Sequence, residues 1–233
     1  MKLTDFYSSS TVCAPSRGSL MTGLHTGHGF IRGNKEIRPE GQHPLPLKAV
    51  TIPEVLKPAG YVSGMFGKWG LGAPGSEGDP MNQGFDRFYG LNCQRQSHNF
   101  YPTHVWSDRK KVILERKHYS HDLIADECIK FIQKNKDNPF FCYVPFTIPH
   151  AAMQSPEKRI APWRKKFPEF EKVTGKYGGS VITNPVAAFA AMMVHMDEDV
   201  GRILDLLEEL KIDENTLVIF TSDNGPHKEG GHK

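Results

Sequence analysis

The sequence lacks several features that would assign it to a specialised class. No apolar run among its 233 residues approaches the roughly 20 residues of a membrane-spanning helix. Its four cysteines contain no CxxC pair and are too widely spaced to suggest a disulfide framework. A net charge of +3 with a pI near 8.6 is milder than the basic balance of a nucleic-acid-binding domain. We therefore expect a globular protein whose partners include neither a membrane nor nucleic acid.

The first residues also lack the character of a secretory signal peptide, and no internal repeat or low-complexity tract is visible. What is present is ordinary: 38% of residues are hydrophobic and 24% are charged. This length and composition suit one domain with a real core. We therefore treat residues 1–233 as a single domain.

Hydrophobic periodicity indicates the fold class. Helices are expected at 52–59, from Ser120 onward, and from Asn184-Pro185 to Leu210. Strands are expected at 2–8, 61–66, 140–146 and 216–221, and the last two read as buried. Residues 71–118 and 155–183 read as a loop region and a surface excursion. The alternation predicts an α/β fold, with a mostly parallel sheet flanked by helices on both faces.

The stretch Cys13–Gly23 (CAPSRGSLMTG) carries the strongest chemical signal. Pro15 suits the first turn of a helix and Gly23 suits its end, so Cys13 lies at a helix N-terminus, which favours anions. Arg17, one turn further on, offers a fork of hydrogen-bond donors to the same anion. The alternative is a purely structural role, with Cys13 as a small buried side chain. A tyrosine-phosphatase loop is excluded, because it needs five residues between cysteine and arginine and this chain has three.

The pattern Cys13-x-Pro-Ser-Arg17, followed by small residues and Thr22-Gly23, closely resembles the signature of the sulfatase family. That family belongs to the alkaline-phosphatase-like superfamily. The resemblance implies that Cys13 is oxidised to formylglycine by a formylglycine-generating or anaerobic sulfatase-maturing enzyme. The hydrated aldehyde would then be the nucleophile in cleavage of a sulfate ester.

Polar side chains follow three of the expected strands. Lys68, His150 and the pair Asp223-Asn224 each come just after an apolar run. Ligands of open α/β sheets bind outside the carboxyl ends of the strands. We therefore expect these residues to gather near Cys13. Taken alone, each could equally be an ordinary solvated residue or part of a turn.

The resemblance assigns roles to this set. It implies that Lys68 and His150 bind the sulfate group, and that Asp223 and Asn224, with modified Cys13, bind Ca²⁺ or another divalent metal such as Mg²⁺. Hard oxygen ligands suit calcium. The implied substrate is a small sulfated carbohydrate or aryl sulfate. Family resemblance favours a periplasmic or extracellular location, which the chain itself does not determine.

The sequence departs from the family pattern in three ways. Nothing before Asp5 supplies the family's aspartate pair, and the further lysine expected after Asp223 is missing. Gly70 stands where a histidine usually follows Lys68, and His98 is a candidate to replace it. We therefore expect a catalytic domain without its N-terminal strand and C-terminal part, with poor metal affinity and weak or no activity of its own.

Two other functions are compatible with these residues. A phosphomonoester or phosphodiester hydrolase of the same superfamily would use similar groups, because sulfate and phosphate esters share tetrahedral geometry. A non-catalytic anion- or glycan-binding remnant is the second alternative. Comparing hydrolysis rates on an aryl sulfate and an aryl phosphate distinguishes a sulfatase from a phosphate-ester hydrolase. Mass spectrometry of the Cys13 peptide distinguishes an enzyme, which would carry formylglycine, from a non-catalytic remnant.

Overall fold

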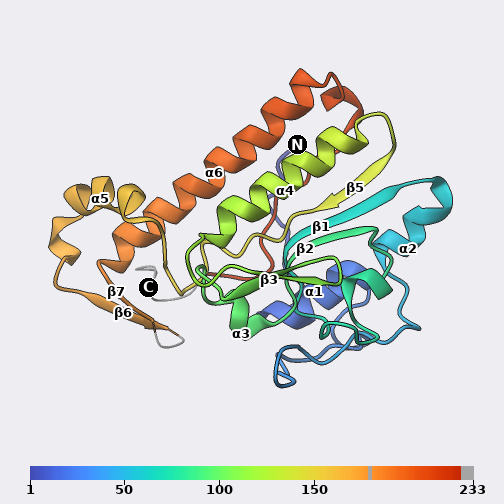
Figure 1. Ribbon diagram of the computed structural model, residues 1–233, viewed down its shortest axis with the longest axis horizontal. Coiled ribbons are helices and arrows are strands. Elements are labelled where there is room, and N and C mark those ends of the chain that lie inside the picture. The colour runs from blue at the N-terminus through green and yellow to red at the C-terminus, as the bar shows by residue number, and fades with distance from the viewer. Residues whose placement is uncertain (178–179, 227–233) are drawn as a thin grey trace.

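The structure, a computed structural model, describes residues 1–177 and 180–226. It is an α/β fold built on a five-stranded sheet with helices above and below it (Figure 1). The strand order is β4-β3-β2-β1-β5. These strands are β1 (Val62–Lys68), β2 (Arg87–Leu91), β3 (His104–Ser107), β4 (Lys110–Ile113) and β5 (Phe140–Tyr143).

The sheet is mixed. Central β1 pairs in parallel with both β2 and β5, whereas β2–β3 and β3–β4 are antiparallel. The α/β prediction is confirmed, and its parallel part is the half that carries Lys68 at a strand end. The antiparallel half comes from a β3–β4 hairpin within a region that we expected to be a loop.

Alternate residues of β1 and β2 face two separate cores. Met65 and Phe88 pack into the core that includes Ala14 and Met21 of helix α1 (Cys13–Thr22). Their neighbours along the strands face the core under helix α4 (Ser120–Asn135) and the end of helix α6 (Pro185–Glu209); these are Phe66 and Tyr89. The period of two along each strand therefore covers both faces of the sheet with helices.

The helices follow the expected start and stop signals. Thr51 and Glu54 form a capping box at α2 (Ile52–Leu56), which continues as the 3₁₀ turn η1 (Lys57–Ala59). The Asn184 side chain accepts a hydrogen bond from Ala187 N at the start of α6. The remaining helical elements are α3 (Gln94–Ser97), α5 (Glu157–Lys166), η2 (Pro80–Asn82), η3 (Pro168–Phe170) and η4 (Asp213–Asn215).

Two expected strands do not form, at 2–8 and at 216–221. Their apolar residues are largely exposed, including Tyr7 at 83% and Ile219 at 73%. A strand needs a hydrogen-bonded neighbour, and within the described ranges no strand pairs with the outer edge of β5. The same missing neighbour explains why β5 is half-buried instead of fully covered.

Two regions contain more structure than the sequence indicated. The expected loop region 71–118 holds β2, α3, β3 and β4, and the expected surface excursion 155–183 holds α5 and a separate two-stranded sheet. That sheet pairs β6 (Thr174–Tyr177) with β7 (Ser180–Thr183). Within the described part of the chain, the structure has no helix of the length and apolarity that crossing a bilayer requires.

Truncating a core aromatic side chain should test this packing. Phe66 is fully buried and its ring lies 5.3 Å from that of Phe131, so Phe66→Ala should cost about 3–5 kcal/mol of unfolding free energy in urea. Phe220 is 69% exposed, so the control Phe220→Ala should stay within about 0.5 kcal/mol of the parent. A large loss at Phe220 would show that segment 216–221 is packed as a strand in solution.

Candidate active site

Cys13 is the first residue of α1 and is buried, with 8% of its surface exposed. The residue before it, Val12, has no side chain able to cap the helix. A side chain from another segment does so, because Asn34 Oδ1 accepts a hydrogen bond from Ala14 N at 2.8 Å. The helix ends at Gly23, which has φ 68° and suits the left-handed terminus. The local sequence and the side-chain amide of Asn34 thus fix Cys13 at the helix N-terminus.

Arg17 ties this helix to two other segments. Its Nη1 donates to Lys68 O at 2.6 Å, and its Nη2 donates to Asp223 Oδ2 at 2.7 Å. Ser16 adds a hydrogen bond from its Oγ to Asp223 O at 2.6 Å. The arginine therefore holds the end of β1 and the Asp223 segment against the start of α1.

Lys68 lies at the centre of the site and is 2% exposed. Its Nζ is 3.3 Å from Cys13 Sγ and 3.3 Å from His98 Nε2. Burial, followed by repulsion from Arg17, lowers the pKa of Lys68 to about 8. Lys68 therefore keeps its ammonium form at neutral pH, but neighbouring groups offset its buried positive charge only in part.

His98 and His150 stack on each other with ring centroids 4.1 Å apart, and Tyr177 packs edge-on against both. Burial, with the nearby charge of Lys68, lowers the pKa of His98 to about 2, so its ring is neutral. A neutral ring accepts a hydrogen bond from the Lys68 ammonium through Nε2. Its proton then lies on Nδ1, which is 3.5 Å from the Tyr177 hydroxyl.

The predicted metal ligands are adjacent but differ in environment. Asp223 forms the ion pair with Arg17. Asn224 Oδ1 is buried and has no hydrogen-bond partner in the described part of the chain, which suits a ligand oxygen. Calcium takes six to eight oxygens, and among the described residues no further carboxylate joins these two in a group of metal-binding donors. The described residues supply part of a calcium shell, so no step of our mechanism depends on the metal.

Gly70 adopts φ 77°, a conformation that favours glycine. A Cβ added there would lie 2.1 Å from Gln94 Nε2. A histidine at this position would therefore require the Gln94 side chain to move. Gln94 begins the short helix α3, which leads into His98, the residue that contacts Lys68.

The structure thus brings together Cys13, Arg17, Lys68, His98 and Asp223 through direct contacts, with His150 stacked behind His98. Sequence reasoning did not single out three further side chains around the site: Asn34, which caps α1, Tyr177, which packs against His98 and His150, and Gln94, which lies beside Gly70. Asn34 lies in a glycine-rich segment that reads as a loop near the site. Tyr177 and Gln94 carried no recognisable signal.

The fold and the site define an α/β protein with buried cationic side chains beside a cysteine at a helix N-terminus. The sulfatase family model matches residues 1–233, and the chain belongs to the sulfatase family. The chain spans less than half the length of the curated relatives that it matches.

Two such relatives are named sulfatases. An arylsulfatase of Hemicentrotus pulcherrimus is 32% identical, with the match covering 98% of this chain and 41% of that protein. The N-acetylgalactosamine-6-sulfatase of Homo sapiens is 30% identical, covering 95% of this chain and 42% of that protein.

Solved structures show the same fold. Ps i-CgsB in complex with k-i-k-neocarrahexaose superposes with a TM-score of 0.76 at 25% identity, covering 97% of this chain and 51% of that one. The phosphonate monoester hydrolase of Agrobacterium radiobacter has a TM-score of 0.56 at 19% identity, covering 93% and 54%, and shows a likeness of fold alone.

Gly70 gives a stability test with a matched control. Gly70→Ala combines backbone strain with overlap against Gln94, whereas Gly75 has a similar φ of 74° and open space around its Cβ position. We expect Gly75→Ala to cost about 1 kcal/mol and Gly70→Ala about 1–3 kcal/mol more in urea unfolding. Adding Gln94→Ala should recover part of the extra cost. Equal costs at the two glycines would contradict the close approach.

Lys68 gives a pH test. Its folded pKa of about 8 lies below its ordinary value of 10.5, so between these pH values the unfolded state binds more protons. The free energy of unfolding, relative to Lys68→Met, should therefore rise from pH 8 to 10.5 and stay level below pH 8. The exposed control Lys134→Met should keep the parent's pH dependence. A parent and a Lys68→Met variant with parallel pH profiles would refute the lowered pKa.

Proposed function

We propose that these residues form the nucleophile and sulfate-binding part of a sulfuric ester hydrolase. The observation that carries this proposal is the contact of 3.3 Å between the buried Lys68 ammonium and Cys13 Sγ within a CAPSR motif. Family membership across residues 1–233 supports it.

The charges of the site suit a sulfate ester. Arg17 and Lys68 bring two buried positive charges, and Asp223 is the one described carboxylate that contacts either of them. A buried excess of positive charge is costly until an anion arrives. The ionised sulfate group would offset it, with Lys68 as the donor nearest the reacting position.

Cys13 is a thiol in this structure, and we propose that formylglycine replaces it in the active protein. The hydrated aldehyde would supply an oxygen nucleophile for sulfur and a second hydroxyl whose deprotonation regenerates the aldehyde and expels sulfate. The helix N-terminus and Arg17 would favour the ionised oxygen. Lys68 and His150 would bind the sulfuryl oxygens, and neutral His98 would orient the Lys68 ammonium.

We further propose that Asp223 and Asn224 hold Ca²⁺, or another divalent metal such as Mg²⁺, together with the modified Cys13. The unpartnered Asn224 oxygen supports this assignment. The metal would add positive charge next to the nucleophile when bound. Because two described side-chain donors make an incomplete shell, we expect calorimetry of this chain to show weak calcium binding. Tight binding would contradict that expectation.

The proposed substrate is a sulfated carbohydrate, with an aryl sulfate as the second option. The name of one relative, N-acetylgalactosamine-6-sulfatase, and the oligosaccharide bound to Ps i-CgsB favour the sugar. We also propose a maturation enzyme as partner and a periplasmic or extracellular location, both on family grounds.

The decisive modification test is mass spectrometry of the Cys13 peptide after co-expression with a sulfatase-maturing enzyme. We expect formylglycine in the parent and in the control Cys128→Ala, whose cysteine is a buried core residue. An unmodified thiol under these conditions would favour a non-catalytic binding remnant.

Activity should be measured on the matured protein translated from the complete natural reading frame that contains these residues. We expect Cys13→Ala to abolish release of sulfate from an aryl sulfate while the circular dichroism spectrum is retained, and Cys128→Ala to keep turnover. Retained turnover in Cys13→Ala would refute the nucleophile. Faster turnover of the matching aryl phosphate would favour the phosphate-ester alternative.

A further inference from the structure

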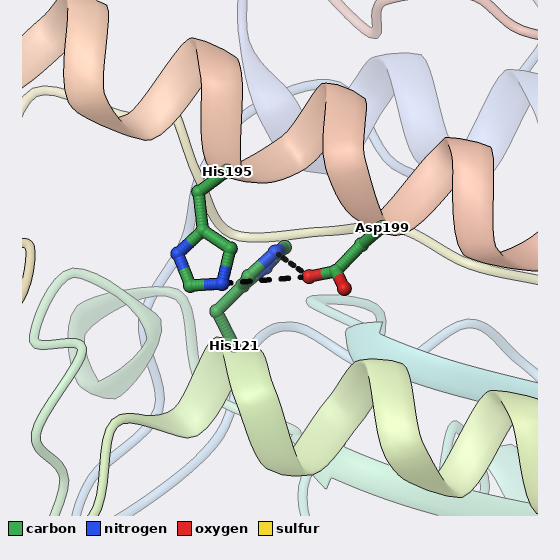
Figure 2. Close-up of side chains that lie close together, drawn as sticks. All are labelled: His121, His195 and Asp199. Atoms are coloured by element: carbon green, nitrogen blue, oxygen red, sulfur yellow. Dashed lines mark ion pairs between the residues drawn. The ribbon is translucent and has the colours of Figure 1, made fainter. Parts of the chain in front are cut away.

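A second cluster of ligand-type side chains lies between helices α4 and α6 (Figure 2). His121 is the second residue of α4, whereas His195 and Asp199 lie one turn apart on α6. Residues four apart share one face of a helix, so His195 and Asp199 both face α4. None of the three belongs to the sulfate-binding set.

The three side chains converge on one point. Asp199 Oδ2 lies 2.8 Å from His121 Nε2 and 3.6 Å from His195 Nε2. Dashed lines in Figure 2 mark both ion pairs. All three side chains are at most 4% exposed. His121 and Asp199 form an ion pair by distance, yet neither His121 Nε2 nor Asp199 Oδ2 has a hydrogen bond of good angular geometry within the described structure. The imidazoles and the carboxylate therefore face one point without well-directed hydrogen bonds between them, an arrangement that a bound cation would satisfy.

A second carboxylate adjoins the cluster. Asp122 Oδ1 lies 3.0 Å from His195 Nε2, and its side chain is 53% exposed. The carboxylate therefore reaches both the buried nitrogen and solvent. It lies outside the three donors that are all within 4.8 Å of one another, but it offers an ion a route of entry.

Arg202 fixes the orientation of the Asp199 carboxylate from the side opposite the two imidazoles. Arg202 Nη1 donates to Asp199 Oδ1 at 2.7 Å, and Arg202 Nη2 donates to Asp126 Oδ1 at 2.8 Å. This leaves Oδ2 facing the two imidazoles. Hydrogen-bonded support of a ligating carboxylate is typical of built metal sites.

We propose that His121, His195 and Asp199 bind a divalent transition-metal cation, with zinc as the best chemical match and with water or a reoriented Asp122 completing the shell. Two imidazole nitrogens, one buried carboxylate oxygen and one further oxygen ligand suit Zn²⁺ in four-coordination, whereas Ca²⁺ and Mg²⁺ prefer oxygen ligands. The carboxylates of Asp199 and the adjacent Asp122 also balance the charge of the ion. The site is thus chemically distinct from the oxygen donors Asp223 and Asn224.

The cation would crosslink α4 to α6 and fix the chain that leads to the sulfate-binding set. The His121 ring packs 4.6 Å from that of Phe146, and the Tyr119 ring stacks 5.7 Å from that of His195. Phe146 lies between β5 and His150 in the sequence. A cation that links the two helices at this point would therefore reduce the motion of the segment that carries His150.

Zinc titration of the full chain tests the proposal. Calorimetry after chelator treatment, in excess Ca²⁺ to saturate oxygen sites, should show one equivalent of Zn²⁺ and a rise in the melting temperature. His121→Gln and Asp199→Asn should weaken zinc binding by more than about 100-fold, since changes behind the ligands already cost about 10- to 100-fold. The exposed control His118→Gln should bind zinc like the parent.

Cobalt substitution keeps the test decisive if the variants fail to fold. Co²⁺ bound to the parent should give the intense visible bands of four-coordinate cobalt, and Zn²⁺ should remove them. Absence of a zinc equivalent, weak six-coordinate cobalt bands, or equal zinc affinity in His121→Gln and the parent would each overturn the proposal. In that case the cluster would be a metal-free network of buried ion pairs. These readouts do not involve sulfate-ester turnover.

Discussion

The site depends on two buried cations placed side by side. Arg17 donates to the backbone carbonyl oxygen of Lys68, and the Lys68 ammonium lies beside Cys13, so both positive charges lie near the start of α1. Only the carboxylate of Asp223 contacts this pair among the described residues. Burial and mutual repulsion lower the pKa of Lys68 to about 8. An arrangement that is electrostatically poor when empty is well suited to an anionic substrate, because binding removes the imbalance.

The chemistry of the site was readable from the sequence because it follows local rules. Pro15 in the first turn of the helix and Gly23 at its end place Cys13 at the N-terminus, and Lys68 ends a short apolar strand. The contacts that assemble the site are not local. Arg17 and Asp223 are separated by 206 positions, and the site's Tyr177 comes from a hairpin in a segment without periodicity. No spacing rule predicts such contacts.

The elements of the fold also differ in how far local sequence predicts them. The helices at 120–135 and 185–209 were predicted because an amphipathic helix satisfies its own backbone and needs only one apolar face. A strand depends on its neighbour, and the apolar run 216–221 stays unpaired despite its strand-like composition. Conversely, β2 to β4 were missed, since such short strands acquire their order from the strand beside them: β2 from β1, β3 from β2 and β4 from β3. Composition alone indicates strand potential and leaves the pairing open.

Gly70 and His98 show how a departure from a family pattern can be compensated within the fold. The left-handed backbone at Gly70 allows Gln94 to occupy the space that a side chain would need. Gln94 begins α3, and one turn later the chain delivers His98 to Lys68. The Gln94 side chain fills the space beside position 70, and the helix that Gln94 begins supplies His98. This link supports our proposal that His98 takes the place of the missing histidine, since a side chain at position 70 would require the Gln94 amide to move.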